Sequence, residues 1–206
     1  MATFSNPRET WNERYSEPDY LFGEAPNEFV RNAARFLAAG QSVLCVADGE
    51  GRNSVWLAEQ GMEVAAFDFA SNAVEKARRL AAARSVRVDH RLDDLMTWDF
   101  VPDQYDALVA IFIQFLGPEQ RTSAFARMQS AVKPGGLFLL EGYTPKQLEY
   151  RTGGPGAIEN LYTREWVESA FSDWEIVELR EYDAVLREGS RHTGMSALID
   201  LVARKR

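Results

Sequence analysis

Two glycines spaced by one residue stand directly after an apolar stretch and directly before a helical pattern. The apolar stretch covers residues 43–47, and Gly49 and Gly51 follow it. Because glycine has no Cβ atom, it lets the backbone come close to a bound molecule. The helix that follows offers unpaired N–H groups to an electron-rich ligand. In an open α/β sheet such a turn lies at the carboxyl edge, where ligands bind. The alternative is an ordinary turn whose glycines serve only the fold.

Carboxylates follow the next two predicted strands at matching places. Asp68 ends a strand predicted over 63–67, seventeen residues past the second glycine. A carboxylate at this point can accept both hydroxyls of a ribose. Asp94 follows the strand predicted over 86–91 and can accept from the exocyclic amine of a base, with the Leu95 N–H beside it. The alternatives are a solvated strand-end carboxylate for Asp68 and a helix cap or loop carboxylate for Asp94.

The glycine turn departs from the pattern of a dinucleotide site. That site needs three glycines in the order Gly-x-Gly-x-x-Gly. Ser54 stands where the third glycine belongs, and Arg52 and Asn53 fill the start of the helix. Two strand-end carboxylates without a phosphate loop fit an adenosine that carries no phosphates. The acidic excess suits a cationic cofactor, and S-adenosylmethionine, a sulfonium, meets all of these conditions.

Alternating strand and helix patterns supply the frame for these residues. Apolar stretches separated by helical patterns predict a parallel sheet with helices on both faces. Two last strands without a helix between them predict an antiparallel pair. The expected fold is α/β, a doubly wound, mostly parallel seven-stranded sheet (Rossmann-like) with a C-terminal antiparallel hairpin. The predicted strands cover residues 43–47, 63–67, 86–91, 105–112, 137–141, 174–182 and 196–203.

Helices and breaks complete this expectation. A helical stripe from Pro26 ends at Gly40, residues 133–136 are expected to break a helix, and a long polar turn is predicted over 187–194. The other predicted helices cover residues 9–16, 52–60, 71–84, 118–132 and 164–171.

The first 25 residues are rich in aromatic side chains. We expect a single domain over 1–206, in which residues 1–25 form an N-terminal arm or lid and residues 26–206 form the catalytic core. The aromatic side chains must pack on something, so two interpretations stay open, a flap over a pocket and a plain arm on the core. They are Trp11, Tyr15, Tyr20 and Phe22.

Composition limits the partners. The formal charge of −8 argues against nucleic acid and against an anionic membrane surface. The single cysteine, Cys45, excludes an internal disulfide and favours the cytoplasm. No apolar run reaches the length of a membrane helix, and no metal site is predicted. We therefore expect a small-molecule substrate and a monomer or weak homodimer.

The chain resembles class I S-adenosylmethionine-dependent methyltransferases over residues 26–203. The family usually has Asp where Cys45 stands and Gly where Ala47 stands, so Cys45 is expected to be a buried core thiol. The resemblance implies S-adenosylmethionine as the cofactor. It rests on Val-Leu-Cys-Val-Ala-Asp-Gly-Glu-Gly-Arg-Asn at 43–53, Ala-Phe-Asp at 66–68, Asp-Asp-Leu at 93–95 and Val-Lys-Pro-Gly-Gly at 132–136.

A narrower resemblance is to small bacterial tellurite-resistance methyltransferases and to thiol methyltransferases of the thiopurine type. It rests on Trp-Asn-Glu-Arg-Tyr at 11–15, on Phe-Gly-Glu-Ala-Pro-Asn at 22–27 and on the compact size. In such relatives the N-terminal segment covers the cofactor, which implies that Tyr15, Phe22 and Asn27 are lid residues. It also implies a small acceptor, a thiol or a soft chalcogen oxyanion.

The predicted cofactor contacts gather at the glycine turn, at the strand ends and in the lid. Asp48 and Glu50 are expected near the ammonium group of the cofactor, and Arg52 and Asn53 near its carboxylate or the lid. The full set is Tyr15, Ala47, Asp48, Gly49, Glu50, Gly51, Arg52, Asn53, Asp68, Phe69, Asp93, Asp94, Leu95 and Ile111.

Methyl transfer is an in-line displacement, so the protein mainly aligns the reacting groups and excludes water. A general base is needed only for a protonated acceptor. The catalytic candidates are His192, whose imidazole can take a proton near neutral pH, and Tyr143, which follows the fifth strand. Their alternatives are an exposed loop histidine and a packing role. Gln114 is a candidate for lining the methyl-transfer channel.

The predicted function is methyl transfer from S-adenosylmethionine to a small-molecule acceptor. One alternative is a non-catalytic S-adenosylmethionine-binding subunit or sensor, supported only by Ala47 and by the lack of an obvious base. Another is an NAD-dependent oxidoreductase, which the missing third glycine and the terminal hairpin disfavour. RNA or protein methylation is disfavoured by the net charge.

Overall fold

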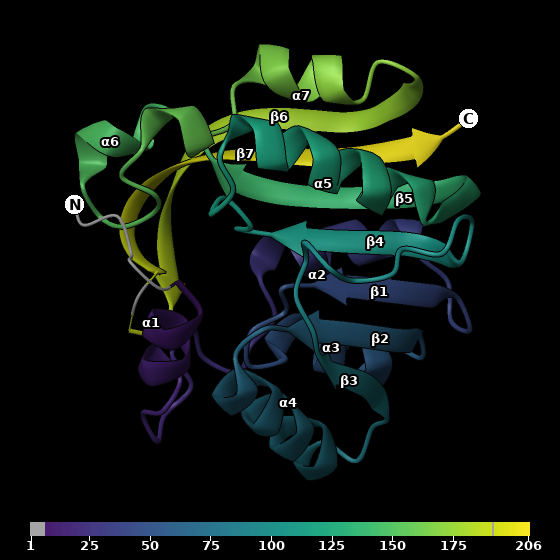
Figure 1. The fold of residues 1–206 in the computed structure, drawn as a ribbon, viewed down its shortest axis with the longest axis vertical. Coiled ribbons are helices and arrows are strands. Elements are labelled where there is room, and N and C mark those ends of the chain that lie inside the picture. The colour runs from purple at the N-terminus through teal and green to yellow at the C-terminus, as the bar shows by residue number, and fades with distance from the viewer. Residues whose placement is uncertain (1–6, 191) are drawn as a thin grey trace. The chain divides into compact units, whose positions relative to one another are not determined.

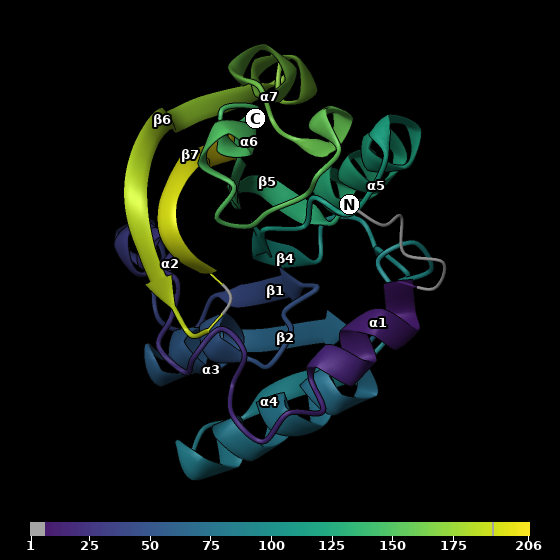
Figure 2. The same ribbon diagram turned by 90° about the vertical axis from the view of Figure 1, so that its left-hand side faces the viewer.

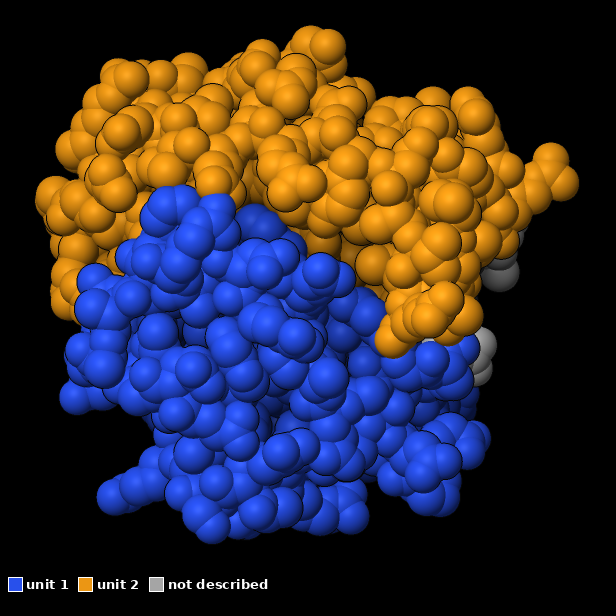
Figure 3. Space-filling model, turned by 180° about the vertical axis from the view of Figure 1, so that it is seen from behind, with its two compact units in different colours: residues 1–98, 188–191 blue, residues 99–187, 192–206 orange. Residues whose placement is uncertain are grey.

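The computed structural model describes residues 7–190 and 192–206. The chain divides into two compact units, residues 1–98 with 188–191 and residues 99–187 with 192–206, which are coloured separately in Figure 3. Each unit is described by itself below, and the expectation of a single domain stays a prediction.

Three parallel strands form the sheet of the first unit. They are β1 (Ser42–Val46), β2 (Glu63–Asp68) and β3 (Val88–Leu92), with β2 in the middle. Leu44 pairs with Ala65, and Ala65 pairs with Asp89. Residues 43–46 of β1 are all buried, as the apolar stretch predicted for a strand covered on both faces.

The helices of the first unit follow the predicted order. They are α1 (Pro7–Arg14), α2 (Glu28–Ala33), η1 (Ala34–Phe36), α3 (Arg52–Glu59) and α4 (Ser71–Ala83). Figure 2 shows α1 against α4. The helix predicted from Pro26 to Gly40 is shorter than expected. Asn27 caps α2 by accepting from the Val30 N–H at 3.1 Å, and the chain becomes extended at Leu37.

Four longer strands form the sheet of the second unit. They are β4 (Tyr105–Ile111), β5 (Val132–Tyr143), β6 (Trp174–Glu188) and β7 (His192–Lys205). The pair β4 and β5 is parallel, and the pair β5 and β7 is antiparallel. Figure 1 shows the strands with α5 (Pro118–Ser130), α6 (Gln147–Tyr150) and α7 (Arg164–Ala170), and η2 covers Ile158–Asn160.

The strand order is β3-β2-β1-β4-β5-β7-β6. The predicted mostly parallel, seven-stranded sheet with a C-terminal antiparallel hairpin is therefore confirmed. An aromatic cluster holds α5 against β5, where the Phe125 and Phe138 rings stack with centroids 5.8 Å apart. None of the helices in residues 7–190 and 192–206 is long and apolar enough to span a bilayer.

One predicted loop is wrong. The long polar turn over 187–194 does not form, because β6 continues to Glu188 and β7 begins at His192. In β6, just before this stretch, Tyr182, Ala184 and Leu186 face a buried cluster and alternate with exposed residues, so one face of this strand is covered. The helix before residues 133–136 ends as predicted, at Ser130, and residues 133–136 themselves belong to β5.

The turn after β1 begins with a residue in an unusual conformation. Ala47 has φ +48°, in the left-handed region that favours glycine, and it stands where the related family usually has glycine. Alanine there keeps the turn at a cost of about 1–2 kcal/mol in backbone strain. Cys45, just before it, is buried as predicted, and burial raises the pKa of its thiol well above the ordinary value.

We predict that Ala47→Gly raises the free energy of unfolding by about 0.5–1 kcal/mol, because relief of strain exceeds the added entropy of the unfolded chain. Urea denaturation measures the change. As a control, Ala126→Gly at an exposed position inside α5 should lower stability by about 1 kcal/mol. Equal losses in both variants would contradict the strain at Ala47.

Candidate active site

The carboxylate of Asp68 joins two turns of the first unit. Its Oδ2 accepts from the Gly49 N–H at 2.9 Å, and its Oδ1 accepts from the Ala70 N–H at 2.9 Å. Burial raises the pKa of this carboxyl to about 6, the N–H groups of Ala70 and Gly49 oppose the rise, and the charge of Asp94 adds to it. The Phe69 N–H also opposes the rise, and a carboxylate with about four lone-pair positions can still accept from a hydroxyl group.

Asp48 takes part in a short polar chain. The Ser54 hydroxyl donates to Asp48 Oδ2 at 2.5 Å and lies 3.2 Å from His90 Nε2. Burial raises the pKa of Asp48 to about 7, the Ser54 hydroxyl opposes the rise, and Asp68 adds to it. Burial lowers the pKa of His90 to about 4, so this imidazole is neutral at pH 7. Asp48 therefore exists in both protonation states near neutral pH.

Protein atoms fill the space that the two glycines leave open. A Cβ atom on Gly49, at φ +62°, would lie 3.0 Å from the Tyr15 hydroxyl. A Cβ atom on Gly51, at φ +89°, would lie 2.7 Å from the Cβ of Ala77, so this glycine lets α3 and α4 pack closely. Both glycines thus have a role in the fold. Close approach of a bound molecule at either one stays a prediction.

Tyr15 brings the N-terminal segment to the glycine turn. Its ring is buried, and burial raises the pKa of its hydroxyl well above the ordinary value, with Asp68 and Glu50 adding to the rise. Its ring stacks on Trp11 with centroids 5.6 Å apart, and Phe22 meets it edge-on at 6.4 Å. The cluster also contains Leu21, Phe69, Ala70 and Ala73.

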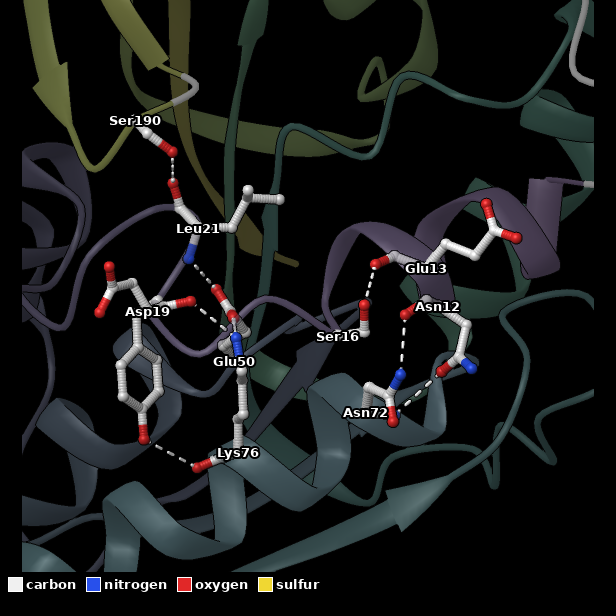
Figure 4. A network of polar contacts seen from close by, with 10 residues as sticks. Asn12, Glu13, Ser16, Asp19, Leu21, Glu50, Asn72, Lys76 and Ser190 are labelled. Carbon is white, nitrogen blue, oxygen red and sulfur yellow. Dashed lines mark hydrogen bonds and ion pairs between the residues drawn. The ribbon is translucent and has the colours of Figure 1, made fainter.

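Asn12 of α1 caps α4 from outside that helix. Ala70 at the N-cap position of α4 has no side-chain acceptor, and Asn12 Oδ1 instead accepts from the Asn72 N–H at 3.0 Å. The Asn72 side chain donates back to the Asn12 carbonyl at 2.9 Å, as Figure 4 shows. These bonds hold α1 beside Phe69, a predicted cofactor contact.

Glu50 anchors the N-terminal segment through a buried ion pair. Its Oε1 accepts from Lys76 Nζ at 2.7 Å, and both side chains are at most 5% exposed. Its Oε2 accepts from the Leu21 N–H at 2.7 Å, and Lys76 also donates to the Asp19 carbonyl at 2.7 Å (Figure 4). Both oxygens of Glu50 are thus bonded within the protein. Its predicted contact with a cofactor ammonium stays a prediction.

Arg52 and Asn53, at the start of α3, bind two distant segments. Arg52 Nη2 donates to Glu188 Oε2 at 2.9 Å, and the Arg52 guanidinium reaches the Phe22 carbonyl at 3.4 Å. Asn53 Oδ1 accepts from the Asn27 N–H at 2.9 Å. Of the two predicted roles, these contacts match the one toward the lid. A contact of either residue with a cofactor carboxylate stays a prediction.

The predicted base-edge residues follow β3. Asp94 Oδ1 accepts from the Met96 N–H at 2.9 Å, and Oδ2 accepts from Arg8 of α1 at 3.1 Å. Asp93 Oδ1 accepts from the Asp94 N–H at 2.8 Å, and the Asp93 N–H donates to the Asp68 carbonyl at 3.1 Å. Leu95 is buried. The carboxylates of Asp68 and Asp94 therefore belong to directly bonded turns, as predicted for one sheet edge.

In the second unit an aromatic cluster brings together both catalytic candidates. The rings of Phe112 and Tyr143 stack with centroids 4.7 Å apart, and the His192 imidazole meets Phe112 edge-on at 4.5 Å. Phe112, directly after β4, has φ +55°, a strained conformation often found at functional sites. His192 is half-buried at the start of β7, so its expected place in a long loop is wrong.

Two other predicted residues lie at the ends of the same strands. Ile111 is half-buried and pairs with Glu141. Gln114 is buried, accepting from the Tyr143 N–H at 2.6 Å and donating to the Tyr143 carbonyl at 2.8 Å. Gln114 thus holds the end of β5, and its proposed role in a channel stays a prediction.

Several residues that hold these segments were not predicted. A role for Lys76 could have been predicted, because it falls on the apolar stripe of α4 between Ala73 and Leu80, where a lysine needs an acidic partner. The role of Glu188 could not have been predicted, since it lies 136 residues from Arg52 in a polar stretch. The other unpredicted contacts come from Arg8, Asn12, Ser54 and His90.

Residues 43–136 match the family model described as a methyltransferase domain. No curated protein is similar enough in sequence to count as a match. Solved structures with similar folds include TehB from Haemophilus influenzae, with 20% identity over 97% of this chain and 67% of that one and a TM-score of 0.74.

Two further structures have the same fold. An S-adenosylmethionine-dependent methyltransferase from Methanosarcina mazei has 18% identity over 88% of this chain and 98% of that one, with a TM-score of 0.68. Magnesium protoporphyrin IX methyltransferase from Synechocystis, with bound S-adenosylhomocysteine, has 14% identity over 97% and 83%, with a TM-score of 0.66. These findings confirm the resemblance to class I methyltransferases that use S-adenosylmethionine as the cofactor.

We predict that Lys76→Met lowers the free energy of unfolding by about 3–5 kcal/mol, because it leaves the Glu50 carboxylate buried without its cation. The double variant Glu50→Gln with Lys76→Met should recover at least half of that loss, since the amide oxygen still accepts from the Leu21 N–H. Chemical denaturation measures both.

Lys133→Met is the matched control, because Lys133 forms a partly exposed pair with Asp106 in the second unit. It should cost no more than about 1 kcal/mol. A double variant as unstable as the single Lys76→Met would contradict the ion pair as the source of the loss.

We predict that stability falls as the pH rises from 6.5 to 8. The pKa of Asp48 is about 7 in the folded protein and 3.8 for an unperturbed aspartate, so in this window the folded state loses a proton that the unfolded state has already lost. The stabilisation by the protonated form is then lost. His90, whose pKa is lowered, destabilises only below about pH 6.5.

Denaturation curves at pH 6.5, 7, 7.5 and 8 test this dependence. Asp48→Asn should flatten the fall, whereas Asp89→Asn on the exposed face of β3 should leave it unchanged. A fall of the same size in Asp48→Asn would show that another group is responsible.

Proposed function

With a methyltransferase domain matched over residues 43–136, we propose that this protein transfers a methyl group from S-adenosylmethionine to a small-molecule acceptor. The observation that carries the proposal is the buried Asp68 carboxylate, bonded to the Gly49 N–H at 2.9 Å. In this proposal the carboxylate, at the end of β2 and directly against the glycine turn, accepts from the ribose hydroxyls. A thiol is the first candidate for the methyl acceptor, and a soft chalcogen oxyanion is the second.

The charges of the first unit fit a cationic cofactor. Burial raises the pKa of Asp48 to about 7 and that of Asp68 to about 6, and the negative charge of Asp68 adds to the rise at Asp48. A cation bound beside them would favour their charged forms. S-adenosylmethionine carries a sulfonium and an ammonium group, and when bound it supplies an activated methyl group on sulfur.

Each segment of the first unit then has a role in binding. Asp68 accepts from the ribose, and Asp94 with Leu95 meets the edge of the base. Phe69 and Tyr15 cover apolar parts of the cofactor. The packing of Tyr15 on Gly49 supports the lid interpretation of the N-terminal arm over the plain-arm interpretation. A covered site excludes water from the transfer.

The aromatic cluster of the second unit supports a thiol acceptor. Phe112 and Tyr143 offer ring faces to a polarizable sulfur atom, an arrangement that gives S–aromatic contacts of about 0.3–1.5 kcal/mol. The His192 imidazole, which meets Phe112 at 4.5 Å, accepts the proton of the thiol as the thiol becomes a thiolate. The thiolate is then the nucleophile. An oxyanion acceptor would need no base.

Activity of the purified chain with labelled S-adenosylmethionine tests the function. Formation of S-adenosylhomocysteine is measured against a panel of aromatic and aliphatic thiols, selenite and tellurite. Turnover with thiols supports the proposal in full, and turnover with selenite or tellurite alone overturns the thiol assignment. Cofactor binding without turnover on the whole panel favours a non-catalytic subunit or sensor. Binding of NADH without S-adenosylmethionine would contradict the proposal.

We predict that Asp68→Asn weakens binding of S-adenosylhomocysteine at least tenfold, because each charge-assisted hydrogen bond contributes about 1.5–3 kcal/mol. Isothermal titration calorimetry measures the affinity, and circular dichroism confirms that the variant folds. Asp89→Asn serves as the matched control and should bind like the wild type. Unchanged affinity in folded Asp68→Asn would rule out the ribose assignment.

A further inference from the structure

The turn between β6 and β7 belongs to the first unit, although both strands belong to the second. The Ser190 N–H donates to the Leu21 carbonyl at 3.0 Å. The Ser190 hydroxyl lies 3.5 Å from the same oxygen, and Figure 4 shows this contact. Gly189 has φ +58°, and a Cβ atom there would lie 2.3 Å from the Leu21 oxygen. Only glycine therefore allows the turn to approach the N-terminal segment this closely.

Glu188 ends β6 with both carboxylate oxygens bonded. Oε2 accepts from Arg52 Nη2 at 2.9 Å, and Oε1 accepts from Asn27 Nδ2 at 3.1 Å. The side chains of Arg52 and Glu188 are only 9% and 12% exposed, so solvent screens this pair weakly. One carboxylate thus joins the start of α3 to the start of α2.

The partners of Glu188 lead to the candidate cofactor site. Arg52 also contacts the Phe22 carbonyl, and its guanidinium lies 5.9 Å from the centroid of the Phe22 ring. Asn27 donates its backbone N–H to Asn53 Oδ1. Leu21, which accepts from Ser190, donates its own N–H to Glu50. These contacts of the turn therefore end on the N-terminal segment or on the residues after Gly51.

The same turn leads directly along the chain into β7 of the second unit. Four residues after Glu188, the chain begins β7 with His192, whose ring meets Phe112 and Tyr143 at 4.5 and 6.0 Å. Because only three residues separate Glu188 from His192, a change at Glu188 is expected to affect a candidate catalytic group. The position of a catalytic group affects rate steeply, even when the change begins elsewhere.

We propose that Glu188 is a positioning residue that fixes the start of β7, and with it His192, by holding the β6–β7 turn on the N-terminal segment and α3. With the N-terminal segment and α3 in their cofactor-binding arrangement, Glu188 holds the β6–β7 turn and fixes the start of β7. Without this carboxylate the turn is released, and His192 loses its fixed place. The coupling of the turn to a bound cofactor rests on the proposed function, whereas the tether itself does not.

Hydrogen exchange of the full chain tests the tether without any ligand. In Glu188→Gln, backbone exchange in residues 20–24 and 186–195 should rise about tenfold, because the charged bond to Arg52 is lost. Exchange in β1 and β5 should stay as in the wild type. Glu175→Gln is the matched control, since Glu175 lies on β6 in an exposed pair with Arg204. Unchanged exchange at 186–195 in Glu188→Gln overturns the proposal.

Saturating S-adenosylhomocysteine tests the coupling. In the wild type it should slow exchange in both 20–24 and 186–195, and in Glu188→Gln only in 20–24. Equal protection of 186–195 in both proteins overturns the coupling. If the wild type binds no S-adenosylhomocysteine, the proposed function fails, and the ligand-free comparison still decides the tether.

A second variant tests the same contact in case Glu188→Gln does not fold. Asn27→Asp keeps the oxygen that caps α2. It replaces the amide nitrogen, which lies 3.1 Å from Glu188 Oε1, by a second negatively charged oxygen. It should reproduce the faster exchange at 186–195. With any thiol that the protein methylates, both variants should lower kcat about tenfold, a fall about equal to the loss of one hydrogen bond. The affinity for S-adenosylhomocysteine should change less than threefold. A fall in affinity alone overturns the positioning role.

Discussion

The buried ion pair between Glu50 and Lys76 is the contact on which the cofactor half of this protein depends. Two charges with side chains at most 5% exposed are costly to bury unless their other hydrogen-bonding positions are also filled. The backbone of the N-terminal segment fills them, since the Leu21 N–H donates to the carboxylate and the Asp19 carbonyl accepts from the ammonium group. The segment cannot leave without exposing the pair or stranding a charge. The ion pair thus orders residues 19–21, which lie between α1 and α2, and it does so directly beside Gly49.

Sequence patterns predicted the parallel part of the sheet because burial there follows simple rules. A strand covered on both faces, such as β1, must be apolar throughout, and the turn after it must contain residues that accept a positive φ. The same reasoning failed for β6 and β7 around residues 187–194. One face of these strands is exposed, so polar residues alternate with apolar ones, and a polar stretch with glycines resembles a turn. Because these residues form strands and not a loop, His192 lies at the start of β7.

The candidate site shows the same division between local and distant information. The topology of a parallel sheet places strand ends together, so Asp68 and Asp94 could be expected to be neighbours from their positions alone. The contacts of Glu188 could not, because a bond to a residue 136 positions away leaves no periodic trace in either segment. Lys76 is an intermediate case. Its place on a buried helix face demands an acidic partner, but the helix alone does not say which one.

The raised pKa values of Asp48 and Asp68 give the glycine turn a meaning beyond its shape. A fold that only needed a tight turn could form it without two carboxyl groups that burial and mutual repulsion make unfavourable when charged. Carboxyl groups with such shifts gather at functional sites, because a bound ligand can offset the free energy that burying their charges costs the fold. A bound cation would lower both pKa values and turn the repulsion into attraction. The pyrophosphate of a dinucleotide would add to the negative charge instead. The electrostatics of the turn therefore favour a positively charged adenosine cofactor on grounds independent of the missing third glycine.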